Sequence, residues 1–157
     1  MTSLRAIALA TAVNVLFSTL VPAQDQEKKI KRGDLPPAVE KTVVEQSRGA
    51  SIRGFSQEKE NGQTFYEAEL IVNGQSKDVL MNVDGAVVEV EEQVSIASLP
   101  PAVRDALQAK AGSGKLVKVE SLTKKGKLVA YEAQILTNGK KSEVQVDRDG
   151  KPLNHEE

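Results

Sequence analysis

An internal repeat is the feature of this sequence that most constrains its fold. The run Leu-Pro-Pro-Ala-Val at residues 35–39 recurs letter for letter at residues 99–103, and residues 66–85 align without a gap with residues 131–150. Eight of these 20 aligned positions are identical, whereas unrelated segments share roughly one position in 20. The sequence therefore predicts two homologous units, at residues 34–92 and 98–157. Each is small enough to be marginal as a domain on its own.

Each copy begins with a pattern typical of a helix. A Pro-Pro pair follows Asp34 in the first copy and Ser98 in the second, and proline is well tolerated only in the first turn of a helix. Apolar residues then recur at helical spacing, with Val39 and Val43 in one copy matched by Val103 and Leu107 in the other. One helix at the start of each copy is therefore predicted.

After each helix the apolar residues alternate with polar ones, as in strands with one buried face. Asn61-Gly62, Asn73-Gly74 and Asn138-Gly139 are strong hairpin signals, since both residues of such a pair tolerate a positive φ. The predicted fold class is α+β, with two tandem repeats, each an N-terminal helix packed on a four-stranded antiparallel sheet. The pattern leaves open whether the copies join edge to edge as one long sheet or meet through a small interface.

Taken together, these motifs resemble the PepSY-like domains of exported bacterial proteins. The resemblance rests on Leu-Pro-x-Ala-Val before the helix, Tyr-Glu-Ala-x-Leu/Ile, Asn-Gly, a valine-rich strand and a closing Asp-Gly, all present twice. The tandem arrangement also resembles the architecture of the secreted β-lactamase inhibitor protein. The resemblance implies a periplasmic or secreted module that binds or restrains a peptidase or another exported protein.

The N-terminal residues have the composition of a secretory signal. Residues 1–5 carry one positive charge, residues 6–20 are mostly apolar, and Val21-Pro22-Ala23 supplies small residues for cleavage after Ala23. Residues 1–23 are therefore predicted to be a cleaved signal peptide. An uncleaved anchor is disfavoured, because about 15 apolar-biased positions fall short of the ~20 that span a bilayer. Residues 24–33 are predicted to be a disordered polar leader, and the mature chain to be periplasmic or secreted.

The charge balance and the residues that are missing exclude several functions. Removing the signal leaves 20 basic and 22 acidic side chains (21 minus Arg5, against 22), a balance that favours no nucleic-acid partner. The chain has no cysteine, which excludes thiol enzymes and zinc–thiolate sites. Its one histidine, His155, is three positions from the C-terminal end, where a catalytic role is not expected. We therefore predict that the protein is not an enzyme and uses no cofactor.

The sheet face opposite the helices is the predicted binding surface. A solvated face seldom carries several large apolar groups, so something is expected to cover it, either the second copy or a partner protein. The predicted partner-binding residues, all from the first copy, are Phe55, Phe65, Glu67, Glu69, Ile71 and Leu80. The matching face of the second copy is more polar, with Glu120, Glu132 and Glu143 among its members.

One alternative function is a calcium- or small-ligand-binding sensor of the cell envelope. Asp147, Asp149 and Glu156 fit positions 3, 5 and 12 of a calcium loop. The first position of that loop would be Gln145 and the flanks are predicted strands, so an ordinary Asp-Gly turn is favoured and no metal is predicted. The first hypothesis is a non-enzymatic exported binding module, which inhibits or regulates a peptidase or another envelope protein.

Overall fold

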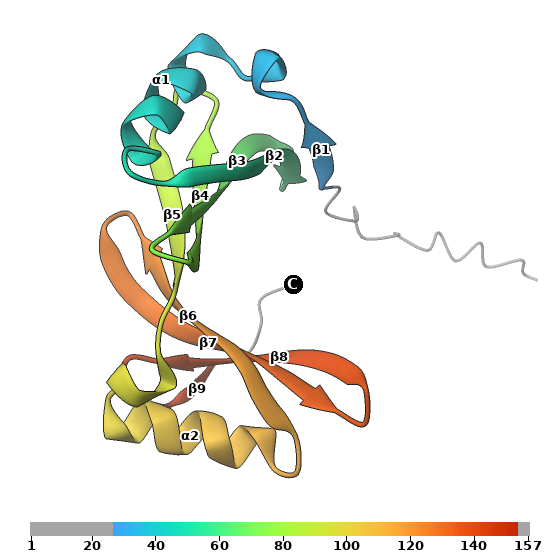
Figure 1. The fold of residues 1–157 in the computed structure, drawn as a ribbon, viewed down its shortest axis with the longest axis vertical. Coiled ribbons are helices and arrows are strands. Elements are labelled where there is room, and N and C mark those ends of the chain that lie inside the picture. Colours follow the sequence, from blue (N-terminus) through green and yellow to red (C-terminus); the bar gives the residue numbers. More distant parts are fainter. Residues whose placement is uncertain (1–26, 154–157) are drawn as a thin grey trace, which may run out of the picture.

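The computed structural model describes residues 27–153, whose strands form one antiparallel sheet in the order β1 to β9 (Figure 1). The helices of this part are α1 (Pro37–Gln46) and α2 (Pro101–Ala111), each preceded by a short 3-10 turn, Arg32–Asp34 and Ile96–Ser98. The strands are β1 (Lys28–Ile30), β2 (Ser51–Glu60), β3 (Gln63–Val72), β4 (Gln75–Asn82), β5 (Val87–Gln93), β6 (Lys115–Lys124), β7 (Lys127–Thr137), β8 (Lys140–Asp147) and β9 (Pro152–Leu153).

The predicted fold class is wrong. Over the described residues the fold is one sheet of nine antiparallel strands with two helices, mostly β, and not two separate repeats of a helix on a four-stranded sheet. The strands β5 and β6 pair from Glu89 with Lys124 to Gln93 with Glu120, which joins everything into a single ladder. This pairing satisfies backbone groups that would otherwise lie at two open edges. Local sequence patterns report hairpins, but they do not report pairing between segments that a helix separates.

Both helices cover the same face of the sheet, over two separate hydrophobic clusters. Val39 and Val43 of α1 are fully buried among the first cluster, and Val103 and Leu107 of α2 among the second. Figure 1 shows α1 and α2 at opposite ends of the molecule with the sheet between them. The core is aliphatic, with Leu70, Val79, Val119 and Val146 at its centre. The other face of the sheet is left without a helix.

The turns and bulges give the sheet its curvature. The Asn-Gly turns are confirmed, since Asn73 and Gly74 have φ of 50° and 83°, and Asn138 and Gly139 have φ of 51° and 79°. The register shifts between Ile52 and Gly54, between Leu80 and Met81, between Leu116 and Lys118, and between Leu122 and Thr123. Bulges bend a strand and increase its twist, so the sheet curves.

Part of the segment predicted to be a disordered leader, residues 24–33, is ordered in the structure. Residues 28–30 form β1, which pairs with β2 from Lys28 with Gln57 to Ile30 with Phe55. Arg32 also attaches this segment to α1 through a bidentate ion pair with Glu40, in which Nη2 lies 2.7 Å from Oε1. The predicted signal peptide and residues 24–26 lie outside the described residues.

Phe55 is not on the open face, contrary to its predicted place among the partner-binding residues. The shift between Ile52 and Gly54 pairs Phe55 with Ala68, and this turns its ring into the first hydrophobic cluster, where it is 7% exposed. Strict alternation along β2 could not reveal this, because a bulge reverses the faces of every residue after it.

Because Phe55 lies in the core and Phe65 on the open face, leucine should destabilise the protein more at position 55 than at position 65. Phe55→Leu should lower the free energy of unfolding by about 1 kcal/mol, since it leaves part of a packed site unfilled. Phe65→Leu on the open face should change it by less than about 0.5 kcal/mol. Urea titrations of the two variants measure the difference, and equal losses would contradict the placement of Phe55.

Candidate functional site

Carboxylates gather on the sheet face that the helices leave open, where they line a groove of about 520 Å³ that we call the acidic groove. Its walls come from β2 to β8, so both halves of the sheet contribute. Among the described residues that line it, nine are acidic and Lys118 is the one basic side chain. The acidic members are Glu27, Glu58, Glu67, Asp78, Glu89, Glu91, Glu120, Glu132 and Glu143.

The strand register places these side chains in rows that cross the sheet. Asp78 of β4 pairs with Glu91 of β5, which pairs with Leu122 of β6. Gln93 of β5 pairs with Glu120, which pairs with Glu132 of β7. Directly paired residues lie on the same face of an antiparallel sheet. The pairing of β5 with β6 therefore brings carboxylates from the two halves into one groove.

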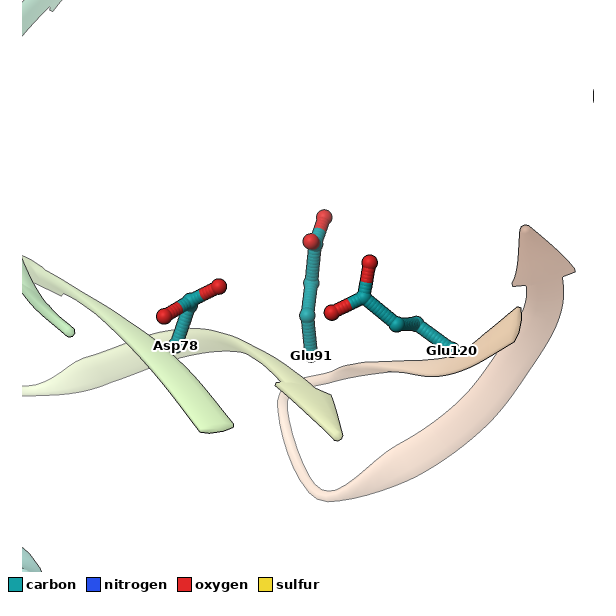
Figure 2. A group of neighbouring side chains, drawn as sticks. All are labelled: Asp78, Glu91 and Glu120. Atoms are coloured by element: carbon teal, nitrogen blue, oxygen red, sulfur yellow. The ribbon is translucent and has the colours of Figure 1, made fainter. Parts of the chain in front are cut away.

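Asp78, Glu91 and Glu120 are the most closely gathered carboxylates of the groove. One oxygen of each lies within 4.8 Å of the others, and Figure 2 shows the three side chains on the same side of their strands. Glu120 is only 7% exposed, and its Oε1 accepts hydrogen bonds from Ser76 Oγ at 3.2 Å and from Lys118 Nζ at 2.6 Å. The lysine ammonium thus already neutralises part of the cluster.

Two further carboxylates are held in place by neutral donors. Ser56 Oγ donates to Glu67 Oε2 at 2.7 Å, and Gln145 Nε2 donates to Glu132 Oε2 at 2.7 Å. These donors orient the carboxylates without cancelling their charge. Both carboxylates therefore keep a negative charge that can form an ion pair with a cationic group.

Three acids of the groove hold their protons to unusually high pH. Burial, followed by the charges of Glu132 and Glu120, raises the pKa of Glu91 to about 8. Burial and the charge of Glu67 raise the pKa of Glu58 to about 7 and that of Asp78 to about 6. Desolvation disfavours an ionised carboxylate, and a neighbouring like charge does the same. The groove is therefore short of positive charge at neutral pH.

Lys118 keeps its charge among these acids, because neighbouring carboxylates favour the protonated ammonium. Burial alone would lower its pKa, but the hydrogen bond to Glu120 and the nearby carboxylates outweigh burial, so the pKa of Lys118 is raised. Lys118 consequently stays positively charged across the physiological range. Lys29 and Lys124 pair with Glu27 and Glu89, so these three ammonium groups leave six of the nine carboxylates of the groove without an ion-pair partner among the described residues.

The predicted partner-binding residues are distributed over several places. Glu67 and Leu80 line the acidic groove, and Phe65 lies on the same face beside it. Glu69 forms an ion pair with Lys29 of β1. Ile71 lies toward the end of β3, where it pairs with Ser51 and Ser76. It is not among the residues that line the acidic groove. Phe55 lies in the core, as described above.

Asp147 and Asp149, the candidate ligands of the less favoured calcium alternative, lie in an ordinary turn. Asp147 Oδ1 accepts hydrogen bonds from the backbone N–H groups of Asp149 at 2.9 Å and Lys151 at 2.8 Å. Asn82 does the same for Asp84 and Ala86 in the first half of the chain. Glu156 and His155 lie outside the described residues. One oxygen of the Asp147 carboxylate is therefore engaged by its own turn.

Sequence reasoning missed the acidic groove as a unit. The sequence places Glu67, Glu120, Glu132 and Glu143 on the open face, but as the solvated side of each copy and not as one site. No local signal connects Glu91 with Glu120, because their proximity depends on the β5–β6 pairing. The excess of acidic residues at strand positions of both copies was the one available hint.

Comparisons with known proteins identify the fold. No family model matches the chain, and no curated protein matches it. Among solved structures, a BLIP-like protein from Bacteroides fragilis has a TM-score of 0.56 at 23% identity, covering 78% of this chain and 86% of its own. The fold is therefore BLIP-like. A DUF2874 family protein from Bacteroides ovatus matches with a TM-score of 0.59 at 21% identity, covering 76% of this chain and 85% of its own.

A third solved structure extends the comparison. It is a protein from Bacteroides eggerthii described as periplasmic, with a TM-score of 0.63 at 18% identity, covering 76% of this chain and 86% of its own. At such identities the likeness establishes the fold alone, and the PepSY-like resemblance stays a prediction. Between residues 27 and 153, neither helix is long and apolar enough to cross a bilayer.

Proposed function

We propose that this protein is a non-enzymatic, exported binding module that holds a basic segment of another envelope protein in its acidic groove. The observation that carries the proposal is the gathering of nine carboxylates around one lysine on the sheet face without helices. A face of this charge attracts Lys and Arg side chains and speeds their approach. The periplasm is proposed as its location, in line with the signal-like N-terminus and the description of the Bacteroides eggerthii structure.

The raised pKa values support a cationic partner. In the free protein burial, together with the charges of neighbouring carboxylates, raises the pKa values of Glu58, Asp78 and Glu91. A Lys or Arg of a partner would supply a positive charge and favour the ionised carboxylates. Partner binding should therefore release protons, and it should strengthen as the pH rises from about 6 to about 8.

The chemistry of the described residues supports a binding role over catalysis. Neither histidine nor cysteine occurs between residues 27 and 153, so this part offers no Ser-His-Asp set and no thiol nucleophile. The face is instead built from carboxylates that Ser56, Gln145 and Lys118 hold in place.

Calorimetric titration with oligolysine of about 15 residues tests the proposal. Binding should be measurable at low salt and should weaken steeply with added salt, because exposed charge pairs are screened. Glu67→Gln/Glu132→Gln removes two charges from the groove while keeping both hydrogen-bond acceptors, and it should weaken binding about tenfold at low salt. The amide substitution leaves the sheet packing unchanged.

A matched control separates the groove from net charge. Glu45→Gln/Asp105→Asn removes the same charge from exposed positions of α1 and α2, on the other side of the sheet. This variant should bind oligolysine within about twofold of the parent. Equal weakening by both pairs of substitutions would contradict a specific role for the acidic groove.

A second candidate function is the binding of a divalent cation by Asp78, Glu91 and Glu120, which the 4.8 Å clustering of their oxygens favours. Calcium takes oxygen ligands, and carboxylates are its commonest donors. A real site would raise the melting temperature with added calcium by mass action. Glu91→Gln should abolish that rise. A melting temperature that calcium leaves unchanged would eliminate this candidate and leave the first one standing.

A further inference from the structure

A second hollow adjoins the acidic groove and has a different character. This apolar pocket, of about 630 Å³, lies where the β2–β3, β4–β5 and β6–β7 turns come together. Phe65, Leu80, Val83 and Val88 form its apolar lining. Val83 is 48% exposed. Phe65, Leu80 and Val88 are partly buried. Apolar side chains that stay partly open to solvent beside a charged groove are typical of a recognition site.

The apolar pocket and the acidic groove are continuous. Leu80 and Glu89, which pair across β4 and β5, line both. Asp78 and Glu91, the next residues along the same face of these strands, pair with each other inside the groove. Side chains two residues apart on a strand are about 6.6 Å apart. One step along the strands therefore leads from the pocket to the carboxylate cluster.

We propose that the apolar pocket takes a large apolar side chain of the basic partner segment, with Lys or Arg two and four residues away lying in the acidic groove. The inference rests on the proposed function and names the kind of segment it requires. An extended segment presents alternate side chains to the sheet at the spacing that separates Leu80 from Asp78. One such segment can therefore fill the pocket and reach the carboxylates together.

Charge complementarity favours a partner protein over a second copy of this chain. A second copy would bring the same acidic face to the groove, and like charges across an interface cost several kcal/mol. Two lysines line the pocket: Lys124 is engaged with Glu89 at 3.0 Å, and Lys125 belongs to the β6–β7 turn. The adjoining groove carries nine carboxylates and one lysine, so the charge of the combined surface matches a basic segment with an apolar anchor.

A tryptophan peptide tests the pocket directly, because the protein contains no tryptophan. The probe is a blocked heptapeptide in which threonines alternate with tryptophan, lysine and lysine, in that order. Its emission should shift to shorter wavelength on binding, and it should bind about tenfold more tightly than the same peptide with alanine in place of tryptophan. A third peptide with tryptophan and both lysines adjacent should lose most of that gain.

Variants of the pocket complete the test. Val88→Ala and the milder Val83→Ser, two residues that line the pocket but not the acidic groove, should each reduce the tryptophan-dependent gain to about threefold or less, while oligolysine binding stays within twofold. Val44→Ser is the control, since Val44 is 47% exposed on α1 and distant from the pocket. Melting curves confirm that each variant folds.

The outcomes separate the two proposals. Oligolysine binding without any advantage of tryptophan over alanine would overturn the apolar pocket and leave the proposed function intact. If the parent protein does not bind oligolysine at all, the proposed function itself is contradicted. A sedimentation profile showing self-association through the same face would identify a second copy as the occupant and would also overturn the inference.

Discussion

Replacing Gly85 by alanine is expected to lower the free energy of unfolding by about 2–4 kcal/mol. Gly85 has φ of +77°, a left-handed conformation that costs other residues about 1–2 kcal/mol. An added Cβ would also lie 2.4 Å from the carbonyl oxygen of Ala38 in α1, where backbone must move. The hydrogen bond from Thr42 Oγ1 to the Gly85 carbonyl oxygen, at 2.7 Å, fixes the same contact. Urea unfolding followed by circular dichroism measures the loss.

Gly74→Ala is the matched control for this prediction. Gly74 has φ of +83°, but nothing lies within 4 Å of its added Cβ, so only the conformational cost of about 1–2 kcal/mol applies. The difference between the two variants isolates the close approach of α1 to the β4–β5 turn. If Gly85→Ala is no more destabilising than Gly74→Ala, the packing of α1 on that turn is not as described.

The stability of the protein is expected to fall as the pH rises from about 4.5 to about 8, through the acids of the groove. In the unfolded chain Glu91 loses its proton near pH 4.5, whereas in the fold its pKa is about 8. Between these values the folded state binds more protons than the unfolded state, so each step up in pH costs stability. Solvent reaches part of Glu58 and Asp78 and screens them. We therefore expect a loss of about 2 kcal/mol.

Glu91→Gln should remove much of this loss. The variant should match the parent at pH 4, where Glu91 is mostly protonated in both the folded and the unfolded chain, and should be about 1–2 kcal/mol more stable at pH 9. The control is Glu92→Gln at the next position, on the opposite face, where an exposed ion pair with Lys77 at 3.1 Å contributes little. Unfolding curves at the two pH values decide the matter. A parent and Glu91→Gln variant that differ equally at pH 4 and pH 9 would contradict the raised pKa.

Much of the local structure could be predicted from the sequence. The Pro-Pro pairs located the starts of α1 and α2, and the Asn-Gly pairs located hairpin turns with positive φ. Val39, Val43, Val103 and Leu107 lie in the core, as their spacing indicated. These features succeed because each depends on a short stretch of chain with a strong conformational preference.

The architecture could not be predicted in the same way. Joining β5 to β6 depends on backbone hydrogen bonds between strands separated by α2, and no residue type marks that choice. The bulge before Phe55 reversed the face of one predicted binding residue. The acidic groove followed from both, since its carboxylates come together only after the sheet is continuous and its faces are correctly assigned.

Locating a bound cationic chain on the protein shows whether the acidic groove is the binding site. Backbone amide shifts of the protein, recorded by NMR during titration with oligolysine, should change at groove strands around Glu67, Glu91 and Glu132, while the exposed surfaces of α1 and α2 remain unaffected. Shift changes confined to the helices, or an absence of changes along β3 to β7, would contradict binding in the acidic groove.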